Sequence, residues 1–314
     1  MTVDRGQALE VRAAKASSAV PRRMGLRDTR GTRIFQGVNA VVLVGVMVVT
    51  LYPFLTIVAR SFSSENYIRS GQVTLIPRGF NTTTYHQVMH DPMFWINYRN
   101  TVVYTVVATI IAMVLTTCYA YVLSKRHIRG RGVLVGIAVF TMFFNGGLIP
   151  NYVLITSLGF KNTLWAIVLP NAISVFNLLV MKSFFEGLPA ELEEAGKLDG
   201  LSTYGILWWI VLPLSKAVVA TMTLFYAVSF WNSWFSAFLY MDKANLFPVT
   251  VYLRNLIAGA TTATSQGAAA GDVAQVAANI QSVTIVLTVL PILLVYPFIQ
   301  RYFVSGVMLG SVKQ

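Results

Sequence analysis

The side chains that could act as acids or bases gather mainly in one polar stretch, the 186–214 loop. Glu191, Glu193 and Glu194 stand close together there, and Asp199 follows. Two carboxylates can serve as a general acid and a general base when they converge on one substrate. These acids are instead spaced along one face of a helix, which favours a surface for another protein over a catalytic centre. We therefore predict that the chain is not an enzyme.

Two further patterns bear on metals and cofactors. His86 and His90 have the i, i+4 spacing that can place two metal ligands on one helix face. The sequence nearby supplies no third ligand, so we interpret them as surface residues and predict no metal site. The chain also lacks the G-x4-G-K-[ST] phosphate-binding loop. We predict no cofactor in this chain, and any Mg-ATP would have to be used by a partner subunit.

The composition points to a membrane protein. Hydrophobic residues make up 55% of the 314 positions, charged residues only 11%, and the mean hydropathy is +0.63. Soluble domains carry about 25% charged residues. The net charge of +12 could suggest nucleic acid, but we expect the position of the basic residues to matter more than their total, and no nucleic-acid partner is predicted.

Six windows free of Asp, Glu, Lys and Arg are long enough to cross the membrane, which takes about 20 apolar residues in a helix. The predicted fold is therefore an all-α, polytopic membrane protein with six transmembrane helices. Prolines in or near these windows are compatible with kinked helices. The windows lie at 34–59, 100–124, 132–160, 162–181, 217–241 and 273–300.

Basic residues set the predicted orientation, because Lys and Arg are enriched in cytoplasmic loops. With the amino terminus inside, the tail, the 124–131 loop, the 182–216 segment and the carboxyl end hold 17 of the 24 Lys and Arg residues. We therefore place both termini in the cytoplasm. Residues 1–33 are predicted to be a disordered, basic cytoplasmic tail, and residues 34–314 the transmembrane domain.

Two segments are expected on the outer side. Residues 61–98 are too polar to span the membrane and are predicted to fold as short helices over the outer mouth. Residues 255–275 are rich in Ala, Gly, Thr and Gln and are predicted to be a mobile outer loop.

The first half of the 186–214 loop carries the signals of a short helix. Pro189 suits the first helical position, and the acidic residues after it lie where the helix dipole favours negative charge. Gly200 can end the helix in a left-handed conformation. One face of this helix is small enough for another protein to approach closely. That face is formed by Leu192, Ala195, Gly196 and Asp199.

The second half is predicted to be another short helix. Ser202 can cap its amino terminus. Ile206, Trp209 and Ile210 are expected to form its apolar face, and Pro213 to mark the return to the membrane. A helix, a glycine corner and a second helix together make a rigid projection that could pass a partner's motion to the membrane helices.

The sequence of this loop resembles that of one family. Glu194-Ala195-Gly196, then Gly200, then Ile210-Val211-Leu212-Pro213 is similar to the E-A-A-x3-G-x9-I-x-L-P loop of permeases in binding-protein-dependent ABC importers. Gly196 departs from the pattern, since the family usually has a second alanine there. The resemblance implies contact with an ATPase through Glu194, Ala195, Gly196, Asp199, Gly200, Ile210, Leu212 and Pro213.

Other segments resemble the carbohydrate-uptake branch of that family, in particular the maltose-type second permease. They are Asn145–Pro150, Thr156–Gly159 with Asn162-Thr163, Phe247–Arg254 and Gln300–Lys313. The resemblance implies a multi-pass protein of the bacterial cytoplasmic membrane, in contact with membrane lipid, that imports an oligosaccharide. It also implies three kinds of protein partner: a second permease in a heterodimer, two copies of a cytoplasmic ATPase and an extracytoplasmic sugar-binding protein.

A neutral, polar path could carry the sugar, because amides and aromatic rings are the groups that bind polyols. The candidate residues lie in the third, fourth and fifth windows. They are Asn145, Asn177, Tyr226, Trp231, Asn232 and Trp234. For the tryptophans an interfacial belt is the alternative, and for Asn145 a helix–helix hydrogen bond.

Two other functions remain open from the residues. An ion-coupled secondary sugar carrier would need titratable or anionic groups within the membrane, and the six windows contain no acidic or basic residue. A membrane-bound enzyme or assembly factor would need acids or histidines that converge on one site. The importer permease is our principal hypothesis.

Overall fold

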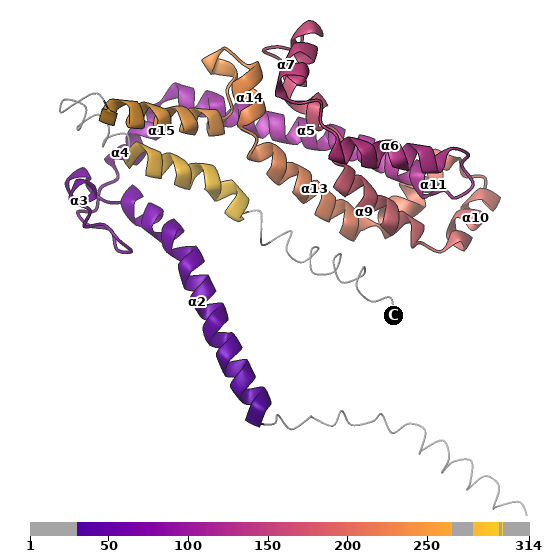
Figure 1. Ribbon diagram of the computed structural model, residues 1–314, viewed down its shortest axis with the longest axis horizontal. Coiled ribbons are helices and arrows are strands. Elements are labelled where there is room, and N and C mark those ends of the chain that lie inside the picture. Colours follow the sequence, from indigo (N-terminus) through magenta and orange to yellow (C-terminus); the bar gives the residue numbers. More distant parts are fainter. Residues whose placement is uncertain (1–29, 266–278, 295–296, 298–314) are drawn as a thin grey trace, which may run out of the picture. The chain divides into compact units, whose positions relative to one another are not determined.

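The computed structural model describes residues 30–265, 279–294 and 297, and the regular structure in this part of the chain is helical (Figure 1). One isolated β-bridge joins Ser63 and Phe80. The chain divides into two compact units, residues 1–53 and 54–314. The predictions for the tail before residue 30 and for the carboxyl end after residue 297 lie outside the described residues.

Helix α2 (Arg30–Ser61) covers the first predicted window and begins four residues before it. Its mean hydropathy reaches 2.5, and the side chains of residues 30–53 are all exposed. An apolar surface of this kind is stable only against lipid or another protein.

Helix α5 (Pro92–Ser124) is the central helix of the second unit. Asp91 begins it, because its Oδ1 accepts a hydrogen bond from the backbone N–H of Met93 at 2.9 Å. Helices α9 (Val175–Glu186) and α13 (Lys216–Trp231) pack along α5. The buried stripe of α5 consists largely of small residues, which let neighbouring helices approach closely. It includes Thr105, Ala108, Ala112, Thr116 and Ala120.

The third window is broken rather than continuous. Helices α6 (Arg131–Phe143) and α7 (Leu148–Ser157) meet at 113°. The chain turns at Gly147, whose φ of +91° lies in the region that favours glycine. The Asn145 side chain supports the turn by accepting a hydrogen bond from the Gly147 N–H.

Two further pairs are bent in the same way. Helices α8 (Trp165–Val168) and η1 (Leu169–Asn171) meet α9 at 53°, and the segment 203–214 meets α13 at 88°. In the described part of the chain, two helices are long and apolar enough to span a membrane, or up to five if each bent pair is one span. The all-helical prediction is confirmed, and the count of six transmembrane helices is not.

The predicted outer segments differ in outcome. Short helices do form within residues 61–98, namely α3 (Glu65–Arg69) and α4 (Thr83–His90). The prediction of a loop from residue 255 is wrong as far as residue 265, because α15 (Val249–Ser265) is helical there. Packing of α15 against α5 overrides its weak helix-forming composition.

Polar side chains of α5 fix the turn that precedes α15, which contains η3 (Ala244–Leu246). Asn100 Nδ2 donates to the carbonyl of Asn245 at 2.7 Å, and the Tyr104 hydroxyl donates to that of Leu246 at 2.9 Å. The N–H of Val249 donates to Thr101 Oγ1 at 2.8 Å. The turn is therefore held by buried and partly buried hydrogen bonds between side chains and backbone, as well as by apolar contact.

A second polar link joins the turn after α7 to the turn after α14 (Phe235–Tyr240). The Asp242 N–H donates to Asn162 Oδ1 at 2.7 Å, and Lys161 Nζ lies 3.0 Å from Asp242 Oδ2. Hydrogen bonds from Lys161 and Asn162 hold the pKa of Asp242 below its usual value. The same Asp242 contact raises the pKa of Lys161.

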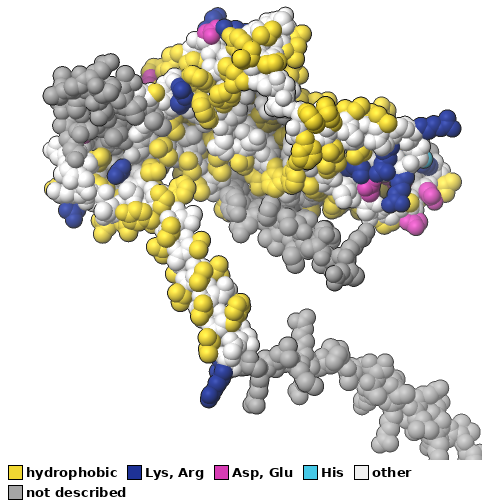
Figure 2. Space-filling view, in the orientation of Figure 1, with side chains coloured by type: hydrophobic (Ala, Val, Ile, Leu, Met, Phe, Trp, Pro, Cys, Tyr) yellow, Lys and Arg dark blue, Asp and Glu magenta, His cyan; other side chains and the backbone are white. Residues whose placement is uncertain are grey.

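Charge is distributed unevenly over the second unit. Figure 2 shows the densest group of Lys, Arg and acidic side chains at the end where α6, α10 and α11 lie, while hydrophobic side chains are numerous over the middle of that face. This end contains the 124–131 and 186–214 loops, which were predicted to share one side of the membrane.

Candidate functional site

The first half of the 186–214 loop is the helix α10 (Ala190–Leu198). Pro189 directly precedes the helix, whereas it was predicted to be the first helical residue. Its carboxyl end is a Schellman motif, in which Leu201 N–H donates to the Gly196 carbonyl at 2.9 Å and Gly200 N–H to the Lys197 carbonyl at 3.0 Å. Gly200 has a φ of +81°, so the predicted left-handed corner is confirmed.

The second half contains α11 (Thr203–Ile206), the π-helical segment η2 (Leu207–Val211) and α12 (Leu212–Leu214). Ser202 caps it as predicted, since its Oγ accepts a hydrogen bond from the Gly205 N–H at 3.2 Å. The predicted apolar face is partly wrong, because Trp209 is 77% exposed. A π-turn widens the backbone and changes which side chains point inward. The buried face is formed by Ile206, Leu207 and Val211, with Ile210 partly buried.

Gly196 lies between the two halves of the loop and not on the surface offered to a partner. It is buried, and a Cβ built on it would meet Ile210 Cδ1 at 2.6 Å and Ile206 Cγ1 at 3.3 Å. The predicted small outer face is therefore wrong at this position. Gly196 instead allows α10 to pack closely on α11 and η2, so that the loop forms one body.

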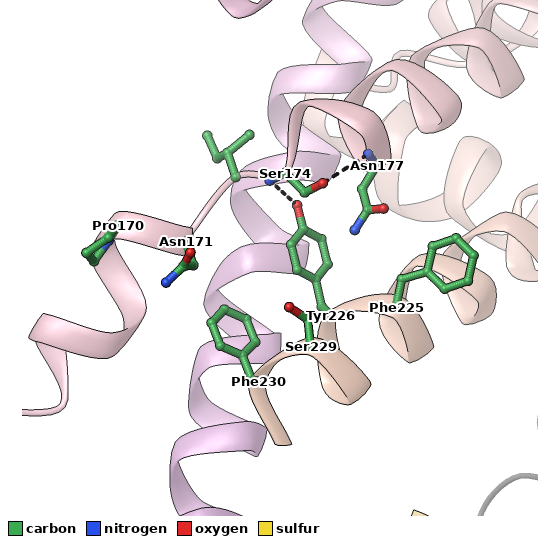
Figure 3. A pocket seen from close by; sticks show the side chains of 9 residues that line it. Pro170, Asn171, Ser174, Asn177, Phe225, Tyr226, Ser229 and Phe230 are labelled. Atoms are coloured by element: carbon green, nitrogen blue, oxygen red, sulfur yellow. Dashed lines mark hydrogen bonds between the residues drawn. The ribbon is translucent and has the colours of Figure 1, made fainter. Parts of the chain in front are cut away.

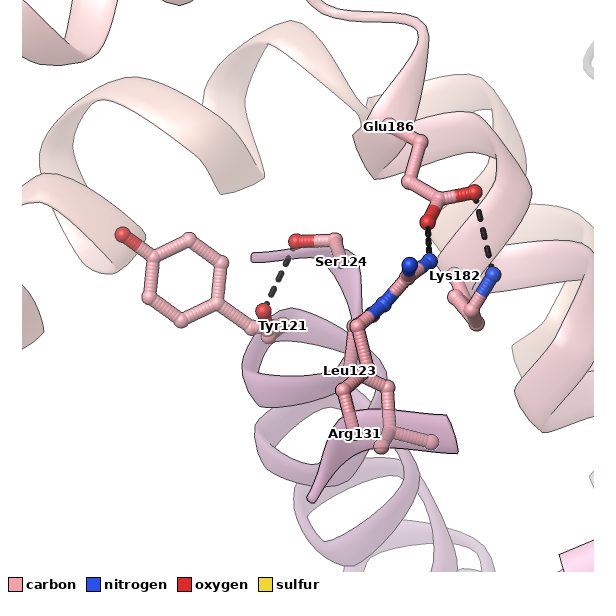
Figure 4. Close-up of polar contacts among 6 residues, drawn as sticks. All are labelled: Tyr121, Leu123, Ser124, Arg131, Lys182 and Glu186. Carbon is pink, nitrogen blue, oxygen red and sulfur yellow. Dashed lines mark hydrogen bonds and ion pairs between the residues drawn. The ribbon is translucent and has the colours of Figure 1, made fainter. Parts of the chain in front are cut away.

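Ion pairs fasten this loop to the ends of three helices. Lys125, just after α5, pairs with Glu193 of α10. Glu186, at the end of α9, pairs with Arg131 at the start of α6 and with Lys182 at 3.0 Å (Figure 4). The side chains in these pairs are only 14–27% exposed, so solvent screens them less than it screens surface pairs.

Two further contacts make the attachment more rigid. Arg131 Nε also donates to the Leu123 carbonyl at 2.6 Å, and the Lys125 ammonium lies 4.2 Å from the centre of the Tyr121 ring. From the sequence, Lys125 and Arg131 served only to predict the orientation of the chain in the membrane, and these contacts were not predicted. Their partners lie 55 to 68 positions away, so no local pattern could reveal them.

The outward surface of α10 carries more acidic than basic residues and has two large apolar ones. Leu198 is 89% exposed and Leu192 is 39% exposed. Other residues exposed here include Glu191, Glu194, Ala195, Lys197 and Asp199. The remaining predicted coupling residues lie in the second half of the loop. Leu212 is partly buried against the core, and Pro213 is exposed in α12.

Two of the candidates for the sugar path lie at a cavity of about 230 Å³ between η1, α9 and α13 (Figure 3). Asn177 and Tyr226 both line it. The Tyr226 hydroxyl is fixed by Thr116 Oγ1 at 2.7 Å and by the Ser174 N–H at 2.8 Å. Asn177 is 4% exposed, and its amide points into the cavity without a hydrogen bond to the described residues. This amide borders the cavity, where water or a ligand can form its hydrogen bonds.

A second cavity, of about 320 Å³, adjoins the first. Pro170 and Asn171 line both, and Asn145 and Asn151 line the second. The lining of both cavities among the described residues is neutral, with amide, hydroxyl and aromatic groups. Asn145 and Asn177, predicted as parts of one path, thus lie at neighbouring cavities.

The other three candidates line neither cavity. Trp231 is buried, and its Nε1 donates to the Thr288 carbonyl at 3.3 Å. Asn232 Nδ2 donates to the carbonyl of Val228 at 2.8 Å. Trp234 packs against the Arg254 guanidinium, whose carbon lies 5.3 Å from the ring centre. Their roles in transport remain predictions.

The histidine pair makes a local contact. The His86 and His90 rings stack with centres 5.0 Å apart, and His90 Nδ1 lies 2.7 Å from the His86 carbonyl. Within the described ranges, no group of three or more potential metal ligands occurs.

Two proteins of Bacillus subtilis are similar to this chain over most of its length. The chain is 41% identical to protein LplC of Bacillus subtilis over 293 residues, which cover 92% of this chain and 98% of LplC. It is 38% identical to the B. subtilis polygalacturonan/rhamnogalacturonan transport system permease YtcP, over 84% of this chain and 93% of YtcP. No family model matches the chain.

A solved structure agrees in both fold and sequence. It is a chain of a bacterial ABC transporter involved in the import of the acidic polysaccharide alginate, with a TM-score of 0.80 and 35% identity over 88% of this chain and 98% of that one. The relatives decide against an ion-coupled secondary carrier and against an enzyme. The chain belongs to the permease subunits of ATP-driven ABC importers for carbohydrates, which are integral proteins of the cytoplasmic membrane.

Proposed function

We propose that the 186–214 loop receives the motion of the ATPase and passes it to three membrane helices at once. Importer permeases work with a separate ATPase and with a binding protein. The observation that carries this proposal is the pair of attachments at Glu193 and Glu186. Through them α10 is joined to the end of α5, and the end of α9 to the start of α6.

The acidic outer surface of α10 is the part that we assign to the ATPase contact. Leu198 can enter an apolar pocket of the partner, and Glu191, Glu194 and Asp199 can pair with basic residues around it. Gly196 and Ile210 act inside the loop, where their close packing makes α10 and the second half move together. A displacement of α10 is then transmitted with little internal deformation.

The substrate proposed is an oligosaccharide that passes the two adjoining cavities. Asn177, Asn145 and Asn171 supply amides, and Tyr226 and Phe230 supply aromatic surface. Such groups suit sugar hydroxyls and the apolar faces of sugar rings. YtcP is named for polygalacturonan and rhamnogalacturonan transport, and the solved transporter imports alginate, which supports a polymeric sugar here.

The remaining parts of the proposal concern assembly. A second, different permease completes the pathway as a heterodimer, and two ATPase subunits bind on the cytoplasmic side. A sugar-binding protein delivers substrate outside. Six transmembrane helices with both termini in the cytoplasm agree with the basic residues at the α10 end of the molecule (Figure 2).

A charge exchange between Lys125 and Glu193 tests the transmission step. Lys125→Glu and Glu193→Lys each leave two like charges side by side, and we expect sugar uptake per ATP hydrolysed to fall about tenfold, the equivalent of about 1.4 kcal/mol of lost coupling. The double exchange restores the attraction and should recover most of the coupling. Equal losses in the single and double variants, at normal membrane insertion, would overturn the proposed transmission.

A further inference from the structure

The second half of the 186–214 loop exposes an unusual set of aromatic side chains. Tyr204 is 75% exposed, Trp208 62% and Trp209 77%. We call these three residues the aromatic face. Large contiguous apolar surfaces on a protein mark sites of contact with a protein, a ligand or a membrane.

The backbone explains why these rings point outward together. Ile206, Leu207 and Val211 occupy the opposite side of the same segment and are buried in the core of the second unit. Since that side is committed to the protein, Trp208 and Trp209 are left on the free side. The segment is thus apolar on both sides, with one side buried in the protein and the other exposed.

The orientation of the segment relates it to the bilayer. Residues 203–214 meet α13 at 88°, with the break at Ser215. Helix α13 is part of an apolar span, and transmembrane helices tilt by about 20° on average from the bilayer normal. A helix perpendicular to α13 therefore runs roughly parallel to the membrane surface, as interfacial amphipathic helices do.

The chemistry around the aromatic face fits lipid headgroups. Tyr204, Trp208 and Trp209 line an open groove of about 350 Å³, mostly apolar. Lys216 is exposed just after the segment. Trp and Tyr concentrate at membrane–water interfaces, and nearby Lys and Arg favour anionic lipid.

We propose that the aromatic face is a bilayer anchor of the permease. Its rings lie among the headgroups and its groove takes up the adjoining apolar part of a phospholipid. The ATPase contact is assigned to the acidic residues of α10, a different element with the opposite charge preference. Lipid then keeps the second half of the loop at the depth of the headgroups while it moves together with α10.

Site-directed nitroxide labels can measure this depth in the assembled transporter. The labels are placed at Trp208→Cys and Trp209→Cys in a Cys118→Ser background, in nanodiscs of equal parts phosphatidylcholine and phosphatidylglycerol. We expect the ratio of oxygen accessibility to aqueous nickel-chelate accessibility to be several-fold higher than for the same label at Gln72→Cys, an exposed position outside the 186–214 loop. Free access of the nickel chelate would overturn the proposal, and so would shielding from both reagents, which would indicate a protein partner.

A second measurement uses the fluorescence of the native tryptophans and needs no attached label. Nanodiscs made with brominated phospholipids quench tryptophan fluorescence at the interface. The double variant Trp208→Phe/Trp209→Phe should lose a substantial part of the quenched signal, whereas Trp231→Phe, which removes a buried ring, should not. An unchanged quenched signal in the double variant would contradict lipid contact.

Discussion

Exchanging Gly196 for alanine tests how closely the two halves of the 186–214 loop are packed. The new methyl group would lie 2.6 Å from Ile210 Cδ1 and 3.3 Å from Ile206 Cγ1. Overpacking of this kind costs about 1–3 kcal/mol, and the flexible end of Ile210 places the cost near the lower limit. Alanine also gains about 1 kcal/mol of helix propensity over glycine. We therefore expect Gly196→Ala to change the free energy of unfolding by no more than about 1 kcal/mol.

Removing the obstructing methyl group should reveal the contact. Ile210→Val alone leaves a small void and should cost about 1 kcal/mol. In Gly196→Ala/Ile210→Val the alanine methyl group fills that void without the clash. The loss in free energy of unfolding of the double variant should therefore be smaller, by about 1–2 kcal/mol, than the sum of the losses of the two single variants.

Equilibrium unfolding of the four proteins in mixed micelles measures this interaction energy, with sugar uptake as a second readout. Lys197→Ala is a matched control, because Lys197 is exposed beside Gly196. Combined with Ile210→Val, it should show additive effects. Strict additivity of Gly196→Ala with Ile210→Val would refute the close packing of α10 on η2.

Three further predictions concern separate features. Gly200→Val should uncouple ATP hydrolysis from uptake, because a β-branched residue is strained by about 1–2 kcal/mol at a φ of +81°. Gly200→Asn should be tolerated, since asparagine adopts the left-handed conformation more readily. Equal activity of the two variants in a coupled ATPase assay would contradict the role of this corner. Asn177→Leu should lower the apparent sugar affinity about tenfold through one lost hydrogen bond, and unchanged uptake kinetics would remove Asn177 from the path. The Lys161–Asp242 link should be insensitive to pH over the neutral range. Because the pKa of Asp242 is lowered in the folded protein, its contribution to the stability of the fold is present above the unfolded pKa of about 4 and is lost as the pH falls through the folded pKa. Because the pKa of Lys161 is raised, its contribution to stability is lost only in strong alkali. A loss of thermal stability between neutral pH and about pH 6 that Asp242→Asn abolishes would contradict this.

The sequence was most informative where composition and local pattern decide the structure. The charge-free windows predicted α2 and α5, because an apolar run of that length needs no distant partner to form a helix. The signals at Gly200 and Ser202 predicted the corner and the second cap correctly, since both act through bonds to residues a few positions away.

The sequence was less informative where backbone geometry or distant contacts decide. Hydropathy counts apolar residues but not bends, so the break at Gly147 and the break between η1 and α9 were not predicted. A period of 3.6 residues grouped Trp209 with Ile206 and Ile210 on one apolar face, but η2 is a π-helical turn and Trp209 lies apart from them, 77% exposed. The pairing of Lys125 with Glu193 depends on the folded arrangement of α5 and α10 and leaves no local trace.

Photo-crosslinking from the outer surface of α10 tests directly whether the 186–214 loop contacts the ATPase subunit. A photoreactive side chain at Leu198, which is 89% exposed, would be activated in intact membranes that contain the assembled transporter. We predict a crosslinked product between Leu198 and the ATP-hydrolysing subunit, and no such product from the same probe at the buried Ile206. Capture of other subunits but never of the ATPase from Leu198 would contradict the proposed role of the 186–214 loop.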